Sequence, residues 1–179
     1  MKISLVNLIF FLILSFSCSQ DPYTAKLGYG TINSFSKKMH QKQHWSPIAI
    51  GGIYGDETIK RMDIEFNCFE KADLSLARKM IIQGIEGFLS EINNNKKITP
   101  YLSQTPYTYE NIFFGIVFDE ADAKFISPPY IAHAFLIKDE ICYSIFNPET
   151  KQLENIHRET YEEALQIVTN ENPELLQVH

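Results

Sequence analysis

The sequence predicts an α+β fold: a largely antiparallel sheet of about five strands, with helices packed mainly on one face. Three observations lead to this prediction. Short strand-like runs follow one another through tight turns, which favours antiparallel pairing of neighbouring strands. Three other segments carry an apolar residue at every third or fourth position, as amphipathic helices do. One run alternates apolar and polar residues, as a strand does when only one of its faces is buried.

Length and charge limit the class of protein. The chain has 179 residues, of which 45% are hydrophobic, so it can form one domain with a substantial core. Its formal net charge of −6 comes without a stripe of Lys and Arg, and binding to nucleic acid is therefore not expected. The same negative charge disfavours adhesion to an anionic membrane surface, so any membrane association must come from the N-terminus.

The first segment has the features of an export signal. Residues 3–14 are apolar apart from Ser4 and Asn7, and Lys2 is the one charged residue before them. A run of about 12 residues is too short to span the ~30 Å of hydrocarbon in a bilayer, but it has the length of a signal-peptide core. Small residues then flank Phe16, which is the pattern that a signal peptidase cleaves. We therefore expect residues 1–17 to be a signal peptide.

The stretch LSFSC, residues 14–18, resembles the lipobox of bacterial lipoproteins, in which a small residue precedes a cysteine that is lipidated and becomes the mature N-terminus. Ser17 and Cys18 match this pattern, whereas Ser15 stands where the lipobox usually has Leu. The resemblance implies acylation of Cys18 and a membrane anchor, with soluble export to the periplasm or the medium as the alternative. Residues 18–30 are expected to be a tether, because they contain a proline and two glycines without sustained periodicity.

A single domain is expected over residues 31–179, and its first half is predicted as helix, hairpin and helix. An apolar stripe over residues 31–43 predicts a short amphipathic helix. Residues 48–69 form a hairpin around a Gly-Asp turn, and the second strand of this hairpin is the one with clear alternation. Asp73 is the expected N-cap of a long helix that ends near residue 93. Within that helix, Gly84 is expected to let a neighbouring element approach closely.

The second half is predicted as three strands and a helix. Residues 112–118 are a continuous apolar run, which is typical of a central strand covered on both faces. Residues 130–137 and 141–146 are two further strands, joined by a tight turn. The last helix covers residues 160–168 and begins with a capping box, in which a Thr is followed three positions later by a Glu.

Three stretches, GFLSEINNNKKITPYL, PYTYENI and ETYEEALQIV, resemble a family of small exported bacterial proteins of unassigned function. The resemblance extends over most of the chain that would remain after removal of the signal peptide. It implies export. It brings no activity, cofactor or catalytic residue, so it assigns none to this chain.

None of the histidines is assigned to a metal or to catalysis. His40 and His44 are four residues apart, the spacing of two ligands on one helix face, but a solvated face explains them without a metal. His133 alternates with apolar residues on a strand, and we expect it to be a hydrogen-bonded core residue.

Acidic and sulfur-containing side chains do not indicate a site either. A calcium loop needs more oxygen ligands and a glycine at its sharp turn, and the acidic loop near residue 120 has neither. Cysteines on strands are expected to be buried, unreactive and unpaired. No catalytic, metal-binding or cofactor-binding residue is therefore predicted, and no cofactor. The residues considered are Asp119, Glu120, Asp122, Cys68 and Cys142.

Four tyrosines lie in loops that are rich in proline: Tyr101, Tyr107, Tyr109 and Tyr130. Tyrosine offers a large contact area at little cost in conformational entropy, so this region is a candidate interaction surface. The other interpretation is that these rings cover an edge of the sheet.

The sequence therefore favours an exported, lipid-anchored protein of the cell envelope that acts as a binding module, with a protein partner in the envelope. Two alternatives remain open. One is a small envelope hydrolase, which requires a cleft where His133 or His157 meets a carboxylate or a hydroxyl. The other is a secreted effector that acts on another cell, for which soluble release is the sign.

Overall fold

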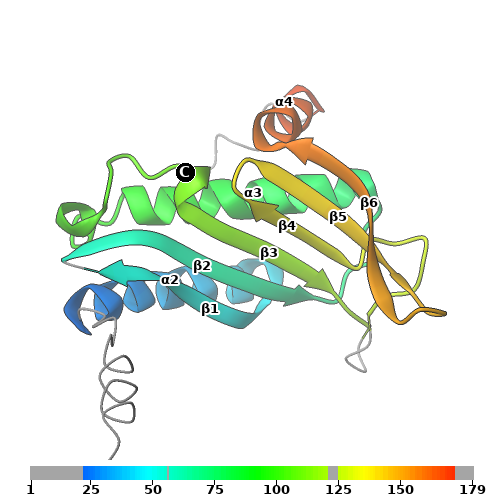
Figure 1. The fold of residues 1–179 in the computed structure, drawn as a ribbon, viewed down its shortest axis with the longest axis horizontal. Helices are drawn as coiled ribbons and strands as arrows, with labels where there is room; N and C mark the ends of the chain where they lie inside the picture. The colour runs from blue at the N-terminus through cyan, green and yellow to red at the C-terminus, as the bar shows by residue number, and fades with distance from the viewer. Residues whose placement is uncertain (1–21, 56, 121–124, 172–179) are drawn as a thin grey trace, which may run out of the picture.

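The computed structural model describes residues 22–55, 57–120 and 125–171, and Figure 1 shows how their elements are arranged. The expected signal peptide, Cys18 and Asp122 lie outside these residues. In chain order the elements are α2 (Pro22–Gln43), β1 (Ser46–Gly55), β2 (Thr58–Cys68), α3 (Leu74–Asn93), the short 3₁₀ turns η1 (Thr99–Tyr101) and η2 (Tyr109–Asn111), β3 (Ile112–Phe118), β4 (His133–Ile137), β5 (Glu140–Asn147), β6 (Gln152–Thr160) and α4 (Tyr161–Glu171).

The predicted α+β fold is confirmed, with one strand more than expected. The six strands form a sheet in the order β1-β2-β3-β4-β5-β6, and all neighbours are antiparallel except β2 and β3. These two are parallel because α3 connects them, and a helical crossover returns the chain in the same direction. The additional strand is β6. Its apolar residues Leu153 and Ile156 are exposed and three positions apart, so they leave no alternating pattern in the sequence.

The helices form one layer on one face of the sheet. Helix α2 packs on β1 and β2, α3 packs on β3 and β4, and α4 packs on β5 and β6, while α3 also contacts both other helices (Figure 1). We call the opposite face of the sheet the open face. Among the helices of the described residues, none is long and apolar enough to cross a bilayer.

The expected tether over residues 18–30 is wrong for residues 22–30, which form the first turns of α2. Pro22 occupies the first position of the helix, where a missing N–H costs nothing. Gly28 is part of the buried stripe of α2, because a Cβ at this position would lie 2.3 Å from the ring of Tyr54. The glycine therefore allows helix and sheet to approach closely and is not part of a flexible linker.

The core is centred on a group of aromatic rings from four elements. The ring centroids of Phe35 on α2 and Phe88 on α3 are 5.0 Å apart, and both rings contact Phe114 of β3. Phe66 of β2 and Trp45 complete the group, with 5.7 Å between their ring centroids. Offset and tilted aromatic pairs at such distances contribute about 0.5–1.5 kcal/mol each beyond the area they bury. Because every element in this group is a neighbour of the others, the rings fix the position of α2 and α3 on the sheet.

Gly84 allows the closest of these contacts, as the sequence predicts. A Cβ at this position would lie 2.3 and 2.5 Å from two ring atoms of Phe114, which is far inside van der Waals contact. Asp73 caps the same helix, since its side chain accepts a hydrogen bond of 2.9 Å from the N–H of Leu76.

The two described cysteines are free and buried, as expected. Cys68 lies on β2 and faces the helices, whereas Cys142 lies on β5 and faces the open side. Two strands separate them, so they cannot form a disulfide. Burial raises the pKa of both thiols, which makes them less reactive.

The first prediction compares two glycines on α3. Gly84→Ala is expected to lower the free energy of unfolding by about 1–2 kcal/mol, because overpacking against Phe114 outweighs the gain in helix propensity. Gly87→Ala is the matched control: its Cβ would lie 3.4 Å from Phe35, an ordinary contact, so the substitution is expected to be neutral or to stabilise by up to about 1 kcal/mol. Urea denaturation of both variants measures the difference. Equal stability of the two would contradict the packing described here.

Candidate functional site

No helix of the described residues lies over the open face, and the side chains of this face come from alternate positions along the strands. They are Ala49, Gly51 and Ile53 on β1, Arg61, Asp63, Glu65 and Asn67 on β2, Phe113, Gly115 and Val117 on β3, His133 and Phe135 on β4, and Cys142 and Ser144 on β5. The expectation that β3 is covered on both faces is therefore corrected. Helices cover one face, and on the other its residues are shielded by side chains of neighbouring strands.

A hydrogen bond between Glu65 and His133 lies at the middle of the open face. Glu65 Oε1 is 2.9 Å from His133 Nε2, although β3 separates their strands. The residue of β3 opposite Glu65 is Gly115, where a Cβ would lie 3.0 Å from Oε1 and 3.2 Å from Cγ of the glutamate. Glycine at this position therefore leaves the space in which the glutamate side chain crosses the strand.

This pair is partly shielded from water and fixes the orientation of the imidazole. The side chains of Glu65 and His133 are 21% and 16% exposed. A carboxylate only accepts hydrogen bonds, so Nε2 carries the hydrogen and donates it to Glu65. The ring of Phe135 stacks on the imidazole at 4.7 Å, and Ser144 lies directly opposite His133 on β5. His133 is thus hydrogen-bonded, as predicted, but its partner is a carboxylate on the open face and not in the core.

A second polar pair extends the site along the strands. The side-chain amide of Asn67 donates a hydrogen bond of 2.5 Å to Asp119 at the end of β3. Burial raises the pKa of Asp119, and this hydrogen bond acts in the opposite direction. Asp119 therefore serves to join the ends of β2 and β3 through Asn67.

A hollow of about 320 Å³ lies beside Glu65 on the open face. Small residues at Ala49 and Gly51 leave the space, and Phe113 forms one wall. Arg61 and Asp63 line it as an ion pair, with 2.8 Å between Nε and Oδ1. The hollow therefore offers an aromatic surface, a carboxylate and a guanidinium group next to the Glu65–His133 pair.

The chemistry available at this site is limited. A histidine held by a carboxylate is the orienting half of a catalytic triad. Such a triad also needs a hydroxyl, and the candidate is Ser144. This serine is buried, and no hydrogen bond between it and His133 is present among the described residues. No group of three or more His, Cys, Asp or Glu side chains able to hold a metal ion is found in the part of the chain that the structure describes.

His157, the second candidate histidine for a hydrolase, also lies near a carboxylate. Its Nε2 lies 3.5 Å from Glu159 on the helix-covered face of β6. Glu159 accepts hydrogen bonds of 2.8 and 3.0 Å from Nε of Arg78, so this ion pair joins α3 to β6. The group connects elements of the fold, and a hollow of about 400 Å³ lies beside His157 and Glu159.

The four tyrosines do not form one surface. Tyr107 is buried and donates a hydrogen bond to the carbonyl of Ile59, which corrects its assignment to an interaction surface. Tyr109 stacks on Tyr161 and donates to Glu162, and this hydrogen bond raises its pKa to about 12. The remaining two are half-buried in different places: Tyr101 meets Tyr23 edge to face, and Lys71 lies over the ring of Tyr130.

His40 and His44 do not share a helix face. Helix α2 ends at Gln43, and His44 follows it with a left-handed φ of 57°, where its N–H bonds to the carbonyl of His40. The Nδ1 of His40 lies 3.3 Å from the carbonyl oxygen of Trp45. Both histidines thus belong to the end of α2.

Sequence reasoning missed the partner of His133. Glu65 is one of several polar residues that alternate along β2, and nothing local distinguishes it from its neighbours. The one signal was Gly115, a glycine inside an apolar strand, which often marks a close approach. No protein-family model matches the chain, and comparison with curated proteins and with solved structures finds no match.

The second prediction tests the central pair. In a double-mutant cycle of Glu65→Ala and His133→Ala, the coupling energy is expected to be about 1 kcal/mol, because the pair is largely shielded from water. The control cycle, Arg61→Ala and Asp63→Ala, removes a pair with a half-exposed arginine and is expected to give less than about 0.5 kcal/mol. Chemical denaturation of the single and double variants gives both values. A Glu65–His133 coupling no larger than the control would contradict the geometry.

Proposed function

We propose that the protein is an exported, lipid-anchored component of the cell envelope that binds a partner through the open face of its sheet. The observation that carries the binding role is that face itself. It presents a shielded Glu65–His133 pair, the half-buried rings of Phe113 and Phe135, and a hollow of about 320 Å³, and the helices that the structure describes all lie on the other face. Aromatic and shielded polar groups together are typical of recognition sites.

The position of α2 supports an anchor that holds the domain close to a membrane. The helix begins at Pro22, four positions after Cys18. Four residues of fully extended chain span at most about 14 Å. An acylated Cys18 therefore places the start of α2 within about 14 Å of the headgroups, where a binding face meets envelope components without a search through bulk solvent.

The third prediction concerns the anchor. Cys18→Ser is expected to turn a membrane-pelleted protein into an unprocessed or soluble one, because two or more acyl chains hold a protein stably to a bilayer and serine cannot receive them. Cell fractionation with mass analysis of the mature N-terminus measures both effects. Recovery of the unsubstituted protein entirely in the soluble fraction, with an unmodified N-terminus beyond residue 18, would contradict the anchor.

The fourth prediction concerns the binding face. A photo-reactive phenylalanine analogue at position 113 is expected to cross-link an envelope component in intact cells. The same analogue at Gln166, which is exposed on α4 on the other side of the sheet, is expected to give no such adduct. Cross-links of equal yield at both positions, or at neither, would argue against the open face as the binding site.

The alternative of an envelope hydrolase is favoured by one specific observation, the placement of Ser144 opposite a histidine that is held by Glu65. A fluorophosphonate probe distinguishes the two functions, since an activated serine displaces its fluoride and becomes phosphonylated, whereas an unactivated serine does not react. Absence of labelling agrees with a binding module. Labelling that Ser144→Ala abolishes would establish the hydrolase instead.

A further inference from the structure

The outer edge of β1 is unpaired in the described part of the chain, and it lacks the charged side chains that usually protect such an edge. An unpaired edge strand offers its N–H and C=O groups to another chain, and proteins normally protect it with charged residues. The ten residues of β1, SPIAIGGIYG, include no charged side chain. Ile48, Ile50 and Ile53 are 53, 43 and 47% exposed.

The other edge of the sheet shows the contrast. Strand β6 carries Glu154, His157, Arg158 and Glu159 within nine residues, and a bulge near Ile156 interrupts its register. On β1 the register shifts at both ends, between Pro47 and Ala49 and between Ile53 and Tyr54. From Ala49 to Ile53 the pairing with β2 is uninterrupted. Alternate residues of this stretch direct both their N–H and their C=O outward, which is enough for a short added strand.

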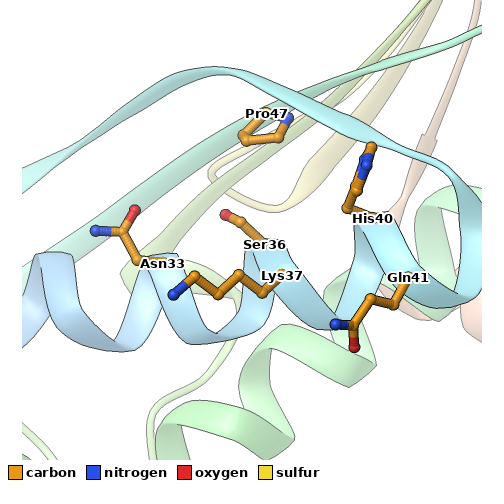
Figure 2. A pocket seen from close by; sticks show the side chains of 6 residues that line it. All are labelled: Asn33, Ser36, Lys37, His40, Gln41 and Pro47. Atoms are coloured by element: carbon orange, nitrogen blue, oxygen red, sulfur yellow. The ribbon is translucent and has the colours of Figure 1, made fainter.

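A groove lies at the start of this edge, between Pro47 of β1 and the helix α2. A hollow of about 400 Å³ separates the two elements, and Figure 2 shows Pro47 facing the helix across it, with Ser36 and His40 pointing towards the strand. Asn33, Lys37 and Gln41 lie along the near side of the helix, at the four-residue spacing that places them on one face. A strand added to β1 would direct every second side chain towards this row.

Helix α2, which forms one wall of the groove and contributes Lys37 to it, is basic in a protein that is acidic as a whole. Helix α2 contains Lys26, Lys37, Lys38 and Lys42 and no Asp or Glu, whereas the chain has a net charge of −6. Lys38 is paired with Glu91 at 2.5 Å, but Lys37 lines the hollow with no acidic partner among the described residues. The occupant that complements this charge carries carboxylates.

We propose that the groove between β1 and α2 binds an extended, acidic segment of a partner protein by strand addition. Main-chain hydrogen bonds to residues 49–53 hold the segment, its helix-side carboxylates meet Lys37, and its other side chains rest beside Ile53 and Ala49. A second copy of this chain fits less well, because pairing two β1 edges would place two lysine-rich helices side by side. The edge borders the open face at Ala49 and Ile53, but the main chain of residues 49–53 and Lys37, which carry this inference, do not belong to the Glu65–His133 site, so the inference does not depend on the proposed function.

Binding of three peptide probes to the full chain in neutral detergent tests the proposal. The probes are a fluorescent peptide of alternating valine and glutamate, its valine and lysine counterpart, and the acidic peptide with alternate amides N-methylated, which cannot add to an edge. Fluorescence anisotropy is expected to show binding of the first probe alone. Lys37→Glu is expected to weaken it by about tenfold, while Lys138→Glu, the same charge change in the β4–β5 turn, leaves it unchanged.

Several outcomes would overturn the proposal. They are no binding of the acidic peptide at millimolar concentration, equal binding of the methylated or basic peptide, and equal effects of the two lysine substitutions. A dimer in sedimentation that Lys37→Glu strengthens would assign the edge to a second copy. If the protein bound phosphatidylglycerol vesicles but no peptide, and Lys37→Glu abolished the vesicle binding, Lys37 and its face of α2 would be assigned to the membrane. Hydrogen exchange localises the contact: slower exchange of the outward amides of residues 49–53 is the expected result.

Discussion

The contact between Gly84 and the ring of Phe114 is the constraint on which the rest of the structure depends. It sets α3 directly on β3, close enough for Phe88 and Phe35 to complete the aromatic group. Helix α3 is also the crossover between β2 and β3, so its position makes those strands parallel neighbours. With α3 in the middle of the layer, α2 and α4 occupy the places on either side of it, and all three helices cover the same face.

The open face follows from this one-sided arrangement. A sheet that buries one face on helices must satisfy the polar groups of its other face with side chains or water. Here the shielding comes from long side chains that cross neighbouring strands, and Gly115 leaves the space for Glu65 to reach His133. The same logic produces the hollow next to it, since Ala49 and Gly51 are too small to fill their places. The side chains of the open face are thus held in fixed positions, and the hollow beside them remains accessible.

The two edges of the sheet differ because their neighbouring helices differ. Strand β6 runs directly into α4, and its charged side chains take part in ion pairs such as Arg78–Glu159. Strand β1 follows α2 and lies beside it, and its own side chains are uncharged and partly exposed. Net charge conceals this asymmetry, because the lysines of α2 are outnumbered by acids elsewhere in the chain. The lysines of α2 form a basic surface only because the fold places this helix beside β1.

The sequence by itself determined the fold class, the bounds of α3 and β3, the alternation along β2, the capping of two helices and the close approach at Gly84. All of these depend on spacing within a few residues, where side-chain periodicity and capping chemistry act. The start of α2, the strand β6, the burial of Tyr107 and the pairing of Glu65 with His133 were decided only by tertiary structure. They depend on which strands become neighbours: Gly115 signals a close approach, but nothing local tells which two residues, 68 positions apart in the chain, will meet across it.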